Sequence, residues 1–397
     1  MNTRPTIDPT EAPLSLSAAF NSTTQAFSVG TENGFCVFDA DSCQLKTSRN
    51  LDGGIGIAEM LGNYNYLALV GGGRNPKWPQ TEVVIWDDAK QKPAMTLRHK
   101  QVVLRVRLNK AHIVVILQNS VHLYDFQPLK KVAVYETADN HLGLCCLGAD
   151  IIAFPGRSDG KLQVVELERK NVSIIPAHTG ALRALELSKD GQFLATASEQ
   201  GTLIRVFSTV NLAKIAELRR GVDAAFIFSL SFSPDSSMLA ITSDKSTLHV
   251  FDVSHVSGRS SAPGSSPGSP YNHHMHSAQI PRPDEDVQPN KWGFLSKLPL
   301  MPRIFNDMYS FTSAPFDMGD EPLASGSSLT YLPSLPGRSV KGLLGWIDDS
   351  TIISIGTGRD GKWERFKLGQ RSYTRRGQVD EIRREIWRDG WKRYLSA

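Results

Sequence analysis

Two adjacent arginines, Arg219 and Arg220, are the residues whose types and spacing point most clearly to chemistry, and Gly221 follows them directly. A guanidinium is a permanent cation with a planar fork of N–H donors, so it matches a phosphate better than an ammonium group does. Successive side chains of an extended segment point to opposite faces. The pair therefore predicts two anion sites, one for each arginine. The alternative is a pair of solvated arginines in a connection between repeats.

A unit of small donors is repeated on both sides of the arginines. Each copy has a serine that ends one expected strand, then a tight turn, and then a threonine and a basic residue on or near the next strand. Hydroxyl groups, backbone N–H groups at a turn and a cation suit a phosphate monoester or the hydroxyls of inositol. The first copy is Ser198, Gly201, Thr202 and Arg205, and the second is Ser243, Thr247 and His249.

His178 opens the repeat that contains the first copy of this unit. In WD-type repeats a histidine at this place belongs to a structural hydrogen-bond network or contacts a ligand, and the sequence leaves both interpretations open. His249 lies in the period-two register with Thr247, which favours a role in a site.

The segments that must position these side chains are short apolar, β-branched runs separated by turn residues. Many close on an aromatic residue followed by an acid, as in Trp86-Asp87 and Phe251-Asp252. They recur about every 38 to 48 residues, which is the period of a four-stranded propeller blade. The sequence therefore predicts an all-β, seven-bladed, WD40-like propeller, with especially clear strands at 193–198 and 238–243. The expected blades cover about 14–50, 55–98, 101–138, 142–176, 181–218, 227–253 and 341–369.

Residues 254–307 interrupt blade six between its third strand and a fourth strand expected at 308–316. The first part of this insertion is rich in Ser, Pro, Gly and His, a composition typical of disorder. The second part is apolar and flanked by lysines, so it predicts a loop that inserts into the headgroup region of a membrane. The alternative is that it packs against the propeller wall. On a helix, one broad arc would hold Trp292, Phe294, Leu295 and Leu298.

The composition excludes several classes of function. The 397-residue chain has a formal net charge of +4, which does not favour a nucleic-acid partner but fits an anionic membrane surface. No stretch reaches the roughly eighteen apolar residues of a membrane span, so any membrane contact should be peripheral. No carboxylate cluster, nucleophile elbow or metal-ligand spacing is present, so we expect no enzyme, no metal site and no cofactor.

The chain should form one domain. We expect residues 1–13 to be a disordered lead and 14–397 to be a single propeller that includes the insertion. With no signal peptide, the protein is expected to be cytoplasmic. The tail at 371–393 alternates basic and acidic side chains, which predicts either a solvated helix or a final edge element.

The run Leu218-Arg219-Arg220-Gly221 resembles the hallmark of the PROPPIN family, in which Phe or Leu precedes Arg-Arg-Gly. PROPPINs are autophagy-related seven-bladed propellers that bind phosphoinositides. The runs at 195–207 and 243–251 also resemble the family closely, and the similarity extends through 346–366 to the end of the chain.

The resemblance implies two phosphoinositide sites on the propeller rim. Their expected ligands are phosphatidylinositol 3-phosphate and phosphatidylinositol 3,5-bisphosphate, and the insertion in blade six would be the family's membrane-inserting loop. Carried over by position, the first site is Ser198, Gly201, Thr202, Arg205 and Arg219, with His178 as a possible member. The second site is Arg220, Gly221, Ser243, Thr247 and His249.

The resemblance also implies protein partners. Family members recruit autophagy factors, and the leucine form is similar to members that engage a large bridge-like lipid-transfer protein, which we expect to contact blades two and three. The expected location is on phagophore or preautophagosomal, endosomal, and vacuolar or lysosomal membranes. The alternative function is a WD-type scaffold whose arginines bind acidic peptides.

Overall fold

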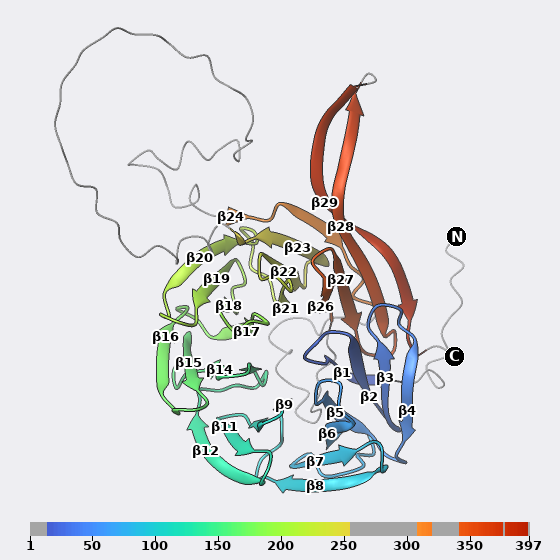
Figure 1. Ribbon diagram of the computed structural model, residues 1–397, viewed down its shortest axis with the longest axis vertical. Helices are drawn as coiled ribbons and strands as arrows, with labels where there is room; N and C mark the ends of the chain where they lie inside the picture. The colour runs from blue at the N-terminus through green and yellow to red at the C-terminus, as the bar shows by residue number, and fades with distance from the viewer. Residues whose placement is uncertain (1–13, 255–307, 320–340, 376–377, 396–397) are drawn as a thin grey trace, which may run out of the picture.

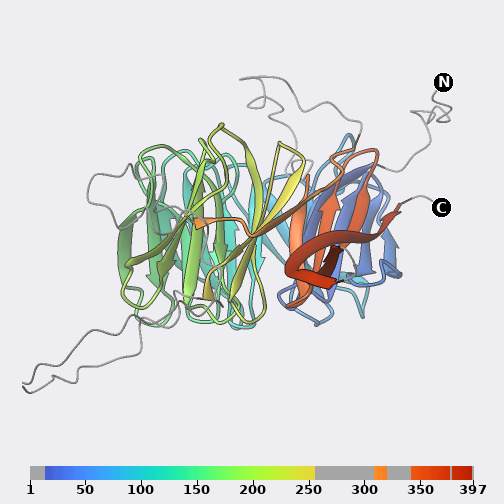
Figure 2. The same cartoon turned by 90° about the horizontal axis from the view of Figure 1, so that it is seen from above.

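Seven β-sheets surround one axis in the computed structural model, which describes residues 14–254, 308–319, 341–375 and 378–395 (Figure 1). This arrangement confirms the all-β, seven-bladed propeller that the repeat period predicts. Figure 2 shows the disc edge-on, with the strands of each blade crossing its thickness. Among the described residues, no helix is long and apolar enough to cross a bilayer.

The first four blades each contain four consecutive strands. Blade one is β1 (Ser15–Phe20), β2 (Ala26–Thr31), β3 (Gly34–Asp39) and β4 (Leu45–Asn50). Blade two is β5 (Ile55–Met60), β6 (Tyr66–Gly71), β7 (Glu82–Asp87) and β8 (Lys92–Arg98). Blade three is β9 (Arg105–Leu108), β10 (His112–Ile116), β11 (Ser120–Asp125) and β12 (Lys130–Glu136). Blade four is β13 (Cys146–Leu147), β14 (Ile151–Pro155), β15 (Lys161–Glu166) and β16 (Val172–Pro176).

The last three blades follow the same order, with one exception in blade five. Blade five is β17 (Leu182–Leu187), β18 (Phe193–Ser198), β19 (Leu203–Ser208) and β20 (Lys214–Arg219), joined by β24 (Met308–Tyr309). Blade six is β21 (Ile227–Phe232), β22 (Met238–Ser243), β23 (Thr247–Asp252) and β25 (Thr312–Pro315). Blade seven is β26 (Leu343–Asp348), β27 (Thr351–Gly356), β28 (Lys362–Arg375) and β29 (Gln378–Arg393).

The core lies between neighbouring blades. The second strands β6, β10 and β22 are buried along almost their whole length, because a blade packs against another blade on each face. This explains why they read as continuous apolar runs. The outer strands β8 and β12 are largely exposed and correspondingly polar. Between blades six and seven, the buried indole of Trp346 donates from Nε1 to the Ser231 carbonyl oxygen over 2.9 Å.

Blades one and seven close the ring without exchanging a strand. The backbones of Ser15 and Gly358 exchange two hydrogen bonds of 3.2 and 3.0 Å. The Tyr394 hydroxyl donates to the Gly356 carbonyl oxygen over 2.8 Å, and Trp363 Nε1 donates to the Ala40 carbonyl oxygen over 2.7 Å. The ends of the ring are therefore held by buried hydrogen bonds as well as by apolar packing.

Blade seven extends further than the sequence predicts. The expected end at 369 omits β29, which pairs with β28 from Lys362↔Arg393 to Arg375↔Gln378. Of the two structures expected for the tail, the helix is therefore wrong and the edge element is correct. The long hairpin of β28 and β29 projects beyond the disc (Figure 1).

The segment after the insertion is divided between two blades. The fourth strand of blade six is β25, which pairs antiparallel with β23 as expected. The prediction of a single strand over 308–316 is wrong, because β24 pairs in parallel with the outer strand of blade five, β20. This pairing satisfies backbone groups that would otherwise be open at the sheet edge. The segment crosses the edge of the disc diagonally (Figure 2). The expected lead at 1–13 and most of the insertion, including its apolar cluster, lie outside the described residues.

Candidate functional site

Arg219 and Arg220 end the outer strand of blade five and belong to opposite faces of it. Arg219 is the last residue of β20 and pairs with Leu203, while Glu217 pairs with Arg205, so these four residues share one face. Leu218 lies on the other face and is fully buried in the core that blade five shares with blade six. Because side chains alternate along a strand, Arg220 follows Leu218 towards blade six.

The first group of side chains lies where blade four joins blade five. Arg205 donates from Nε to Glu217 Oε2 over 2.8 Å and from Nη1 to the Ala177 carbonyl oxygen over 2.6 Å. Lys214 Nζ lies 2.8 Å from the same Glu217 oxygen. The guanidinium of Arg205 is thus fixed in place by a carboxylate and a backbone carbonyl. Its remaining donors are available to an anion.

His178 belongs to a local hydrogen-bond network. Its Nε2 lies 2.9 Å from the hydroxyl oxygen of Thr196, in the second strand of the blade. Burial, and after it the positive charge of Arg205, lowers the pKa of His178 to about 4. The ring is therefore neutral at pH 7. The structural role that the sequence left open is present, and the ring lies close enough to Arg205 to influence that side chain.

The turn that begins at Ser198 requires glycine at its fourth residue, Gly201. Gly201 has a φ of +60°, and a Cβ there would lie 1.9 Å from the Ala225 carbonyl oxygen. Its N–H donates to the Ser198 carbonyl oxygen over 3.0 Å. The turn is thereby packed against the connection that leads into blade six.

The second group lies where blade five joins blade six. Arg220 donates from Nε to the Gly201 carbonyl oxygen over 2.9 Å and from Nη2 to the Asp223 carbonyl oxygen. Burial lowers the pKa of Arg220, and the carboxylates of Asp244 and Asp223 oppose this effect. Burial and the charge of Arg220 also lower the pKa of His249. Arg220 and His249 therefore interact electrostatically.

The other residues expected in this group differ in how far they are exposed to solvent. Ser243 is fully buried, and its hydroxyl oxygen accepts the Lys245 N–H over 3.4 Å. The Thr247 hydroxyl donates to the Lys245 carbonyl oxygen over 2.9 Å. A Cβ on Gly221 would meet open space. The serine and threonine therefore fix the turn, and the exposed Lys245 lies at its tip.

Both groups occupy the same place in the repeat. The His178 N–H donates to the Gly160 carbonyl oxygen over 2.8 Å, and the Arg220 N–H donates to the Thr202 carbonyl oxygen over 3.0 Å. Each acceptor is the residue just before the third strand of its blade. The partner side chain comes in each case from the third residue of the third strand in the following blade. The first pair is His178 with Arg205, and the second is Arg220 with His249.

Two polar neighbours of these groups, Glu217 and Ser310, are not among the residues predicted from the sequence. Glu217 stands two residues before Arg219, so period-two reasoning could have placed it on the same face. Ser310 could not have been found in this way. Its hydroxyl lies 3.1 Å from Nδ1 of His249, but it comes from the segment beyond the insertion, 61 residues away.

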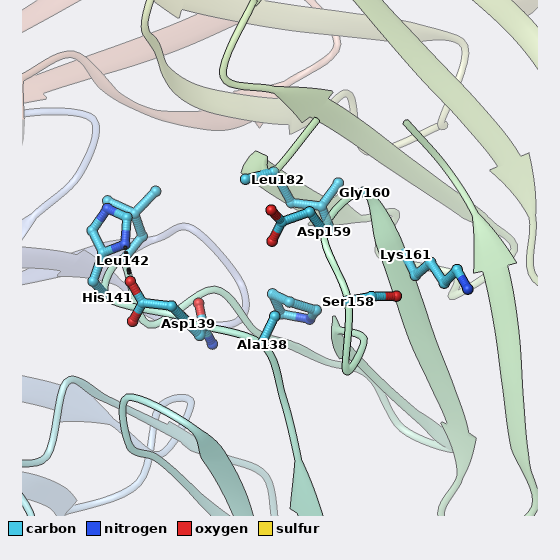
Figure 3. Close-up of a pocket in the computed structure, with 12 residues that line it drawn as sticks. Ala138, Asp139, His141, Leu142, Ser158, Asp159, Gly160, Lys161 and Leu182 are labelled. Atoms are coloured by element: carbon cyan, nitrogen blue, oxygen red, sulfur yellow. Dashed lines mark ion pairs between the residues drawn. The ribbon is translucent and has the colours of Figure 1, made fainter. Parts of the chain in front are cut away.

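A separate pocket lies among the loops of blades three, four and five (Figure 3). Asp139 and Asp159 contribute two carboxylates to its lining, and Asp139 forms an ion pair of 3.3 Å with His141. None of the expected site residues lines it. Its acidic character does not favour a phosphate.

The chain is similar to known proteins in both sequence and fold. A family model described as PROPPIN matches residues 15–282. SVP1-like protein 2 of Emericella nidulans is 52% identical over 342 residues, which cover 85% of this chain and 99% of that protein. Autophagy-related protein 18e of Arabidopsis thaliana is 37% identical over 246 residues, covering 59% of this chain and 65% of that protein.

A solved structure of similar fold is Kluyveromyces lactis Hsv2 with its complete loop 6CD. It superposes with a TM-score of 0.70 and 21% identity, and the match covers 96% of this chain and 100% of that chain. At this identity the likeness shows the fold. Together with the family model and the sequence relatives, it leads to one assignment. The chain belongs to the PROPPIN family of autophagy-related β-propellers.

Proposed function

We propose that this protein binds 3-phosphorylated phosphoinositides at two rim sites and brings autophagy proteins to the membranes that carry them. The observation that supports this most strongly is the position of Arg219 and Arg220 on opposite faces of blade five. Each face meets a neighbouring blade at an equivalent junction. The ligands are phosphatidylinositol 3-phosphate and phosphatidylinositol 3,5-bisphosphate, and the protein acts by binding, without catalysis or a cofactor.

The first site takes a headgroup between blades four and five. The donors left on Arg205, together with Arg219 and the turn 198–202, would bind the phosphate. Glu217 has two opposite effects on this site. Its carboxylate repels a phosphate, but it also holds the guanidinium of Arg205 in place. Lys214, on the same carboxylate, offsets part of that negative charge.

The second site takes a headgroup between blades five and six. Arg220 is already oriented by two backbone carbonyls, so few rotamers are lost when an anion binds. His249 and the exposed Lys245 lie on the blade-six side. An anion beside His249 would raise the pKa of that ring and favour its charged form.

Two sites on one membrane strengthen each other. A single headgroup site of micromolar affinity corresponds to about −8 kcal/mol. Once one site is occupied, the second binding event is intramolecular, which raises the overall affinity by roughly a hundredfold or more. The apolar cluster of the insertion, at Trp292 and Phe294, would add an anchor that does not depend on lipid identity.

Vesicle flotation tests the proposal. Wild-type protein should float with vesicles that contain either 3-phosphorylated lipid, and not with vesicles that contain unphosphorylated phosphatidylinositol. A double variant with Arg219→Ala and Arg220→Ala should lose this binding at pH 7.5. The matched control is Arg157→Ala with Arg169→Ala, two exposed arginines of blade four. Undiminished flotation of the Arg219 and Arg220 variant would refute the proposal.

The proposed function also includes a protein partner. A protein that holds membranes by blades five and six leaves blades two and three open to the bridge-like lipid-transfer protein of the family. We place the protein peripherally on phagophore or preautophagosomal, endosomal, and vacuolar or lysosomal membranes, in exchange with the cytoplasm. A pull-down with substitutions on β8 should lose that partner while vesicle flotation persists.

A second candidate function is a scaffold for acidic peptides. The carboxylate that Arg205 already holds at 2.8 Å favours it, because the same fork would accept an acidic side chain. Capture of acidic peptides without lipid, with no gain from phosphoinositides, would favour this candidate over the first.

A further inference from the structure

The junction between blades two and three is built like the two candidate sites. The His99 N–H donates to the Thr81 carbonyl oxygen over 2.9 Å, and Thr81 is the residue just before the third strand of blade two. His99 therefore occupies the repeat position of His178 and Arg220. In the following blade, His122 is the third residue of β11, the position that Arg205 and His249 hold in their own strands.

The other described junctions of this kind carry different side chains. The same two positions hold Leu51 with Val84 where blade one meets blade two, and Thr137 with Gln163 where blade three meets blade four. Where blade six meets blade seven they hold Phe316 with Glu364. Among the described junctions that show this hydrogen bond, basic or imidazole side chains fill both positions at the two candidate sites and at the blade-two junction.

The two histidines of this third junction are in contact. Their ring centroids lie 5.2 Å apart, with the rings nearly perpendicular. The Ser120 hydroxyl oxygen lies 3.1 Å from Nε2 of His122. The ammonium of Lys131 lies over the ring of Tyr124, 5.5 Å from its centre, and Tyr124 in turn packs against His99. One hydroxyl, two imidazoles and one ammonium thus meet at a single place on the rim.

Two ring nitrogens of this junction have no hydrogen-bond partner. They are Nε2 of His99 and Nδ1 of His122, both buried. A buried polar atom without a hydrogen-bond partner lowers the stability of the fold, so its presence calls for an explanation such as a bound ligand. His99 and His122 are each only partly buried as whole residues, and Lys131 beside them is exposed.

We propose that the junction of blades two and three is a third anion site, where His99, His122 and Lys131 bind a phosphate monoester. The ligand class rests on the proposed function, because it is carried over from the two equivalent junctions. The geometry of the third junction stands independently of it.

Binding at this site should depend on pH. Burial is the main cause that lowers the pKa of His99 to about 4, and His122 and Lys131 also contribute. Burial and Lys131 lower the pKa of His122. Both rings are therefore neutral at pH 7 without a ligand. Ser120, Tyr124 and Lys131 lie around the two rings. The acidic Glu136 pairs with Ser120 on the same face, and its carboxylate is 3.4 Å from the guanidinium of Arg157. An entering phosphate supplies the missing negative charge and favours protonation of a ring. For each proton taken up, binding strengthens by up to about tenfold per pH unit of acidification between the pKa of the bound ring and that of the free ring.

The third site lies on another part of the rim than the first two. In Figure 1, β8 lies at the bottom of the disc and β24 at the top, while blade four separates β12 from β20 on the same side. A chain held on a membrane through Arg219 and Arg220 would present this junction to a soluble phosphate compound or to the headgroups of a second membrane. The soluble compound and the lipid headgroup would each offer a phosphate monoester.

Isothermal titration calorimetry with soluble inositol 1,3-bisphosphate tests the site. At pH 6.0 the Arg219→Ala and Arg220→Ala double variant should still bind one equivalent, and at pH 7.5 its affinity should fall at least tenfold. Adding His122→Gln or Lys131→Glu should abolish the remaining binding. Lys130→Glu, a neighbouring exposed residue on the same strand, is the matched control and should leave it intact. Thermal unfolding of each variant verifies that it is folded, and the exposed Lys131 gives a variant that does not disturb the core.

Two results would overturn the proposal: no binding by the double variant at pH 6.0, or binding that His122→Gln and Lys131→Glu leave unchanged. Failure of the proposed function looks different, since wild-type protein would then fail to float with vesicles at pH 7.5. Flotation of the double variant at pH 6.0, abolished by Lys131→Glu, would identify lipid as the source. Binding in the calorimeter without flotation would identify a soluble phosphate compound.

Discussion

The guanidinium of Arg220 and the carbonyl of Gly201 are joined by a hydrogen bond of 2.9 Å, so the turn of the first candidate site orients the cation of the second. The two sites therefore share a structural element. A change in the turn should be detected on both faces of blade five.

Replacing Gly201 tests this link. Gly201→Ala places a Cβ 1.9 Å from the Ala225 carbonyl oxygen, at a φ of +60° that alanine adopts with strain. We expect a loss of about 2 kcal/mol or more in the free energy of unfolding, together with weaker headgroup binding at both sites. Chemical denaturation and calorimetry measure the two effects. Gly191→Ala, also at positive φ but with open space around its Cβ, separates strain from collision.

The single arginine variants should differ from each other. Arg219→Ala and Arg220→Ala should each remove one equivalent of soluble inositol 1,3-bisphosphate at pH 7.5. Arg220→Ala should also lower the free energy of unfolding by about 1 to 2 kcal/mol, because two backbone carbonyls lose a charged donor. If either variant alone removed both equivalents, the two arginines would serve one pocket.

Stability should decline in mild acid. The folded protein holds the pKa of His178 at about 4, whereas the unfolded chain has the ordinary value of 6.5. As the pH falls from 6.5 to 4, the unfolded chain takes up a proton that the folded ring does not, so stability is lost across this range. The loss from this group is at most about 3 kcal/mol. Denaturation midpoints of wild type and His178→Gln should converge as the pH falls, and a constant difference would contradict this account.

The ring closure can be tested at one hydroxyl. Tyr394→Phe removes the hydroxyl that donates to the Gly356 carbonyl oxygen and leaves the packing of the aromatic side chain in place. We expect a loss of about 1 to 2 kcal/mol, since the abandoned carbonyl is poorly hydrated. Differential scanning calorimetry measures it. Lipid binding should not change, because the hydroxyl lies on the seam between blades one and seven.

The apolar cluster of the insertion gives a prediction from sequence. Trp292→Asp with Phe294→Asp should weaken vesicle flotation while leaving soluble inositol 1,3-bisphosphate binding intact, because acidic side chains are repelled by an anionic interface. Equal loss of both would indicate a defect in folding. The control is a pair of acidic substitutions at Ser260 and Ser261, in the polar part of the insertion.

Local pattern was sufficient to predict the blades. The strands expected at 193–198 and 238–243 have the bounds of β18 and β22. This succeeded because most of the paired strands are consecutive in sequence, so apolar runs and turn residues carry the information. The opposite faces of the two arginines follow from the same period-two rule.

The features that sequence analysis missed depend on distant pairing. The parallel pairing of Leu218 with Met308 joins residues on the two sides of the insertion, and no local pattern encodes it. The contact of Ser310 with His249 has the same origin. For β29, the charged tail has the composition of a solvated surface, and only its long register with β28 shows that it is a strand.

The parallel pairing of β24 with β20 has a mechanical consequence. It involves only two residue pairs, whereas β25 is held by four pairs to β23. Tension on the insertion would therefore detach β24 first and leave blade six intact. Detachment of β24 would release residues 308 and 309 and lengthen the connection before β25 by about 7 Å. These residues therefore form a short, weakly held length of chain beside the strand of Arg219, which can be released without the loss of a blade.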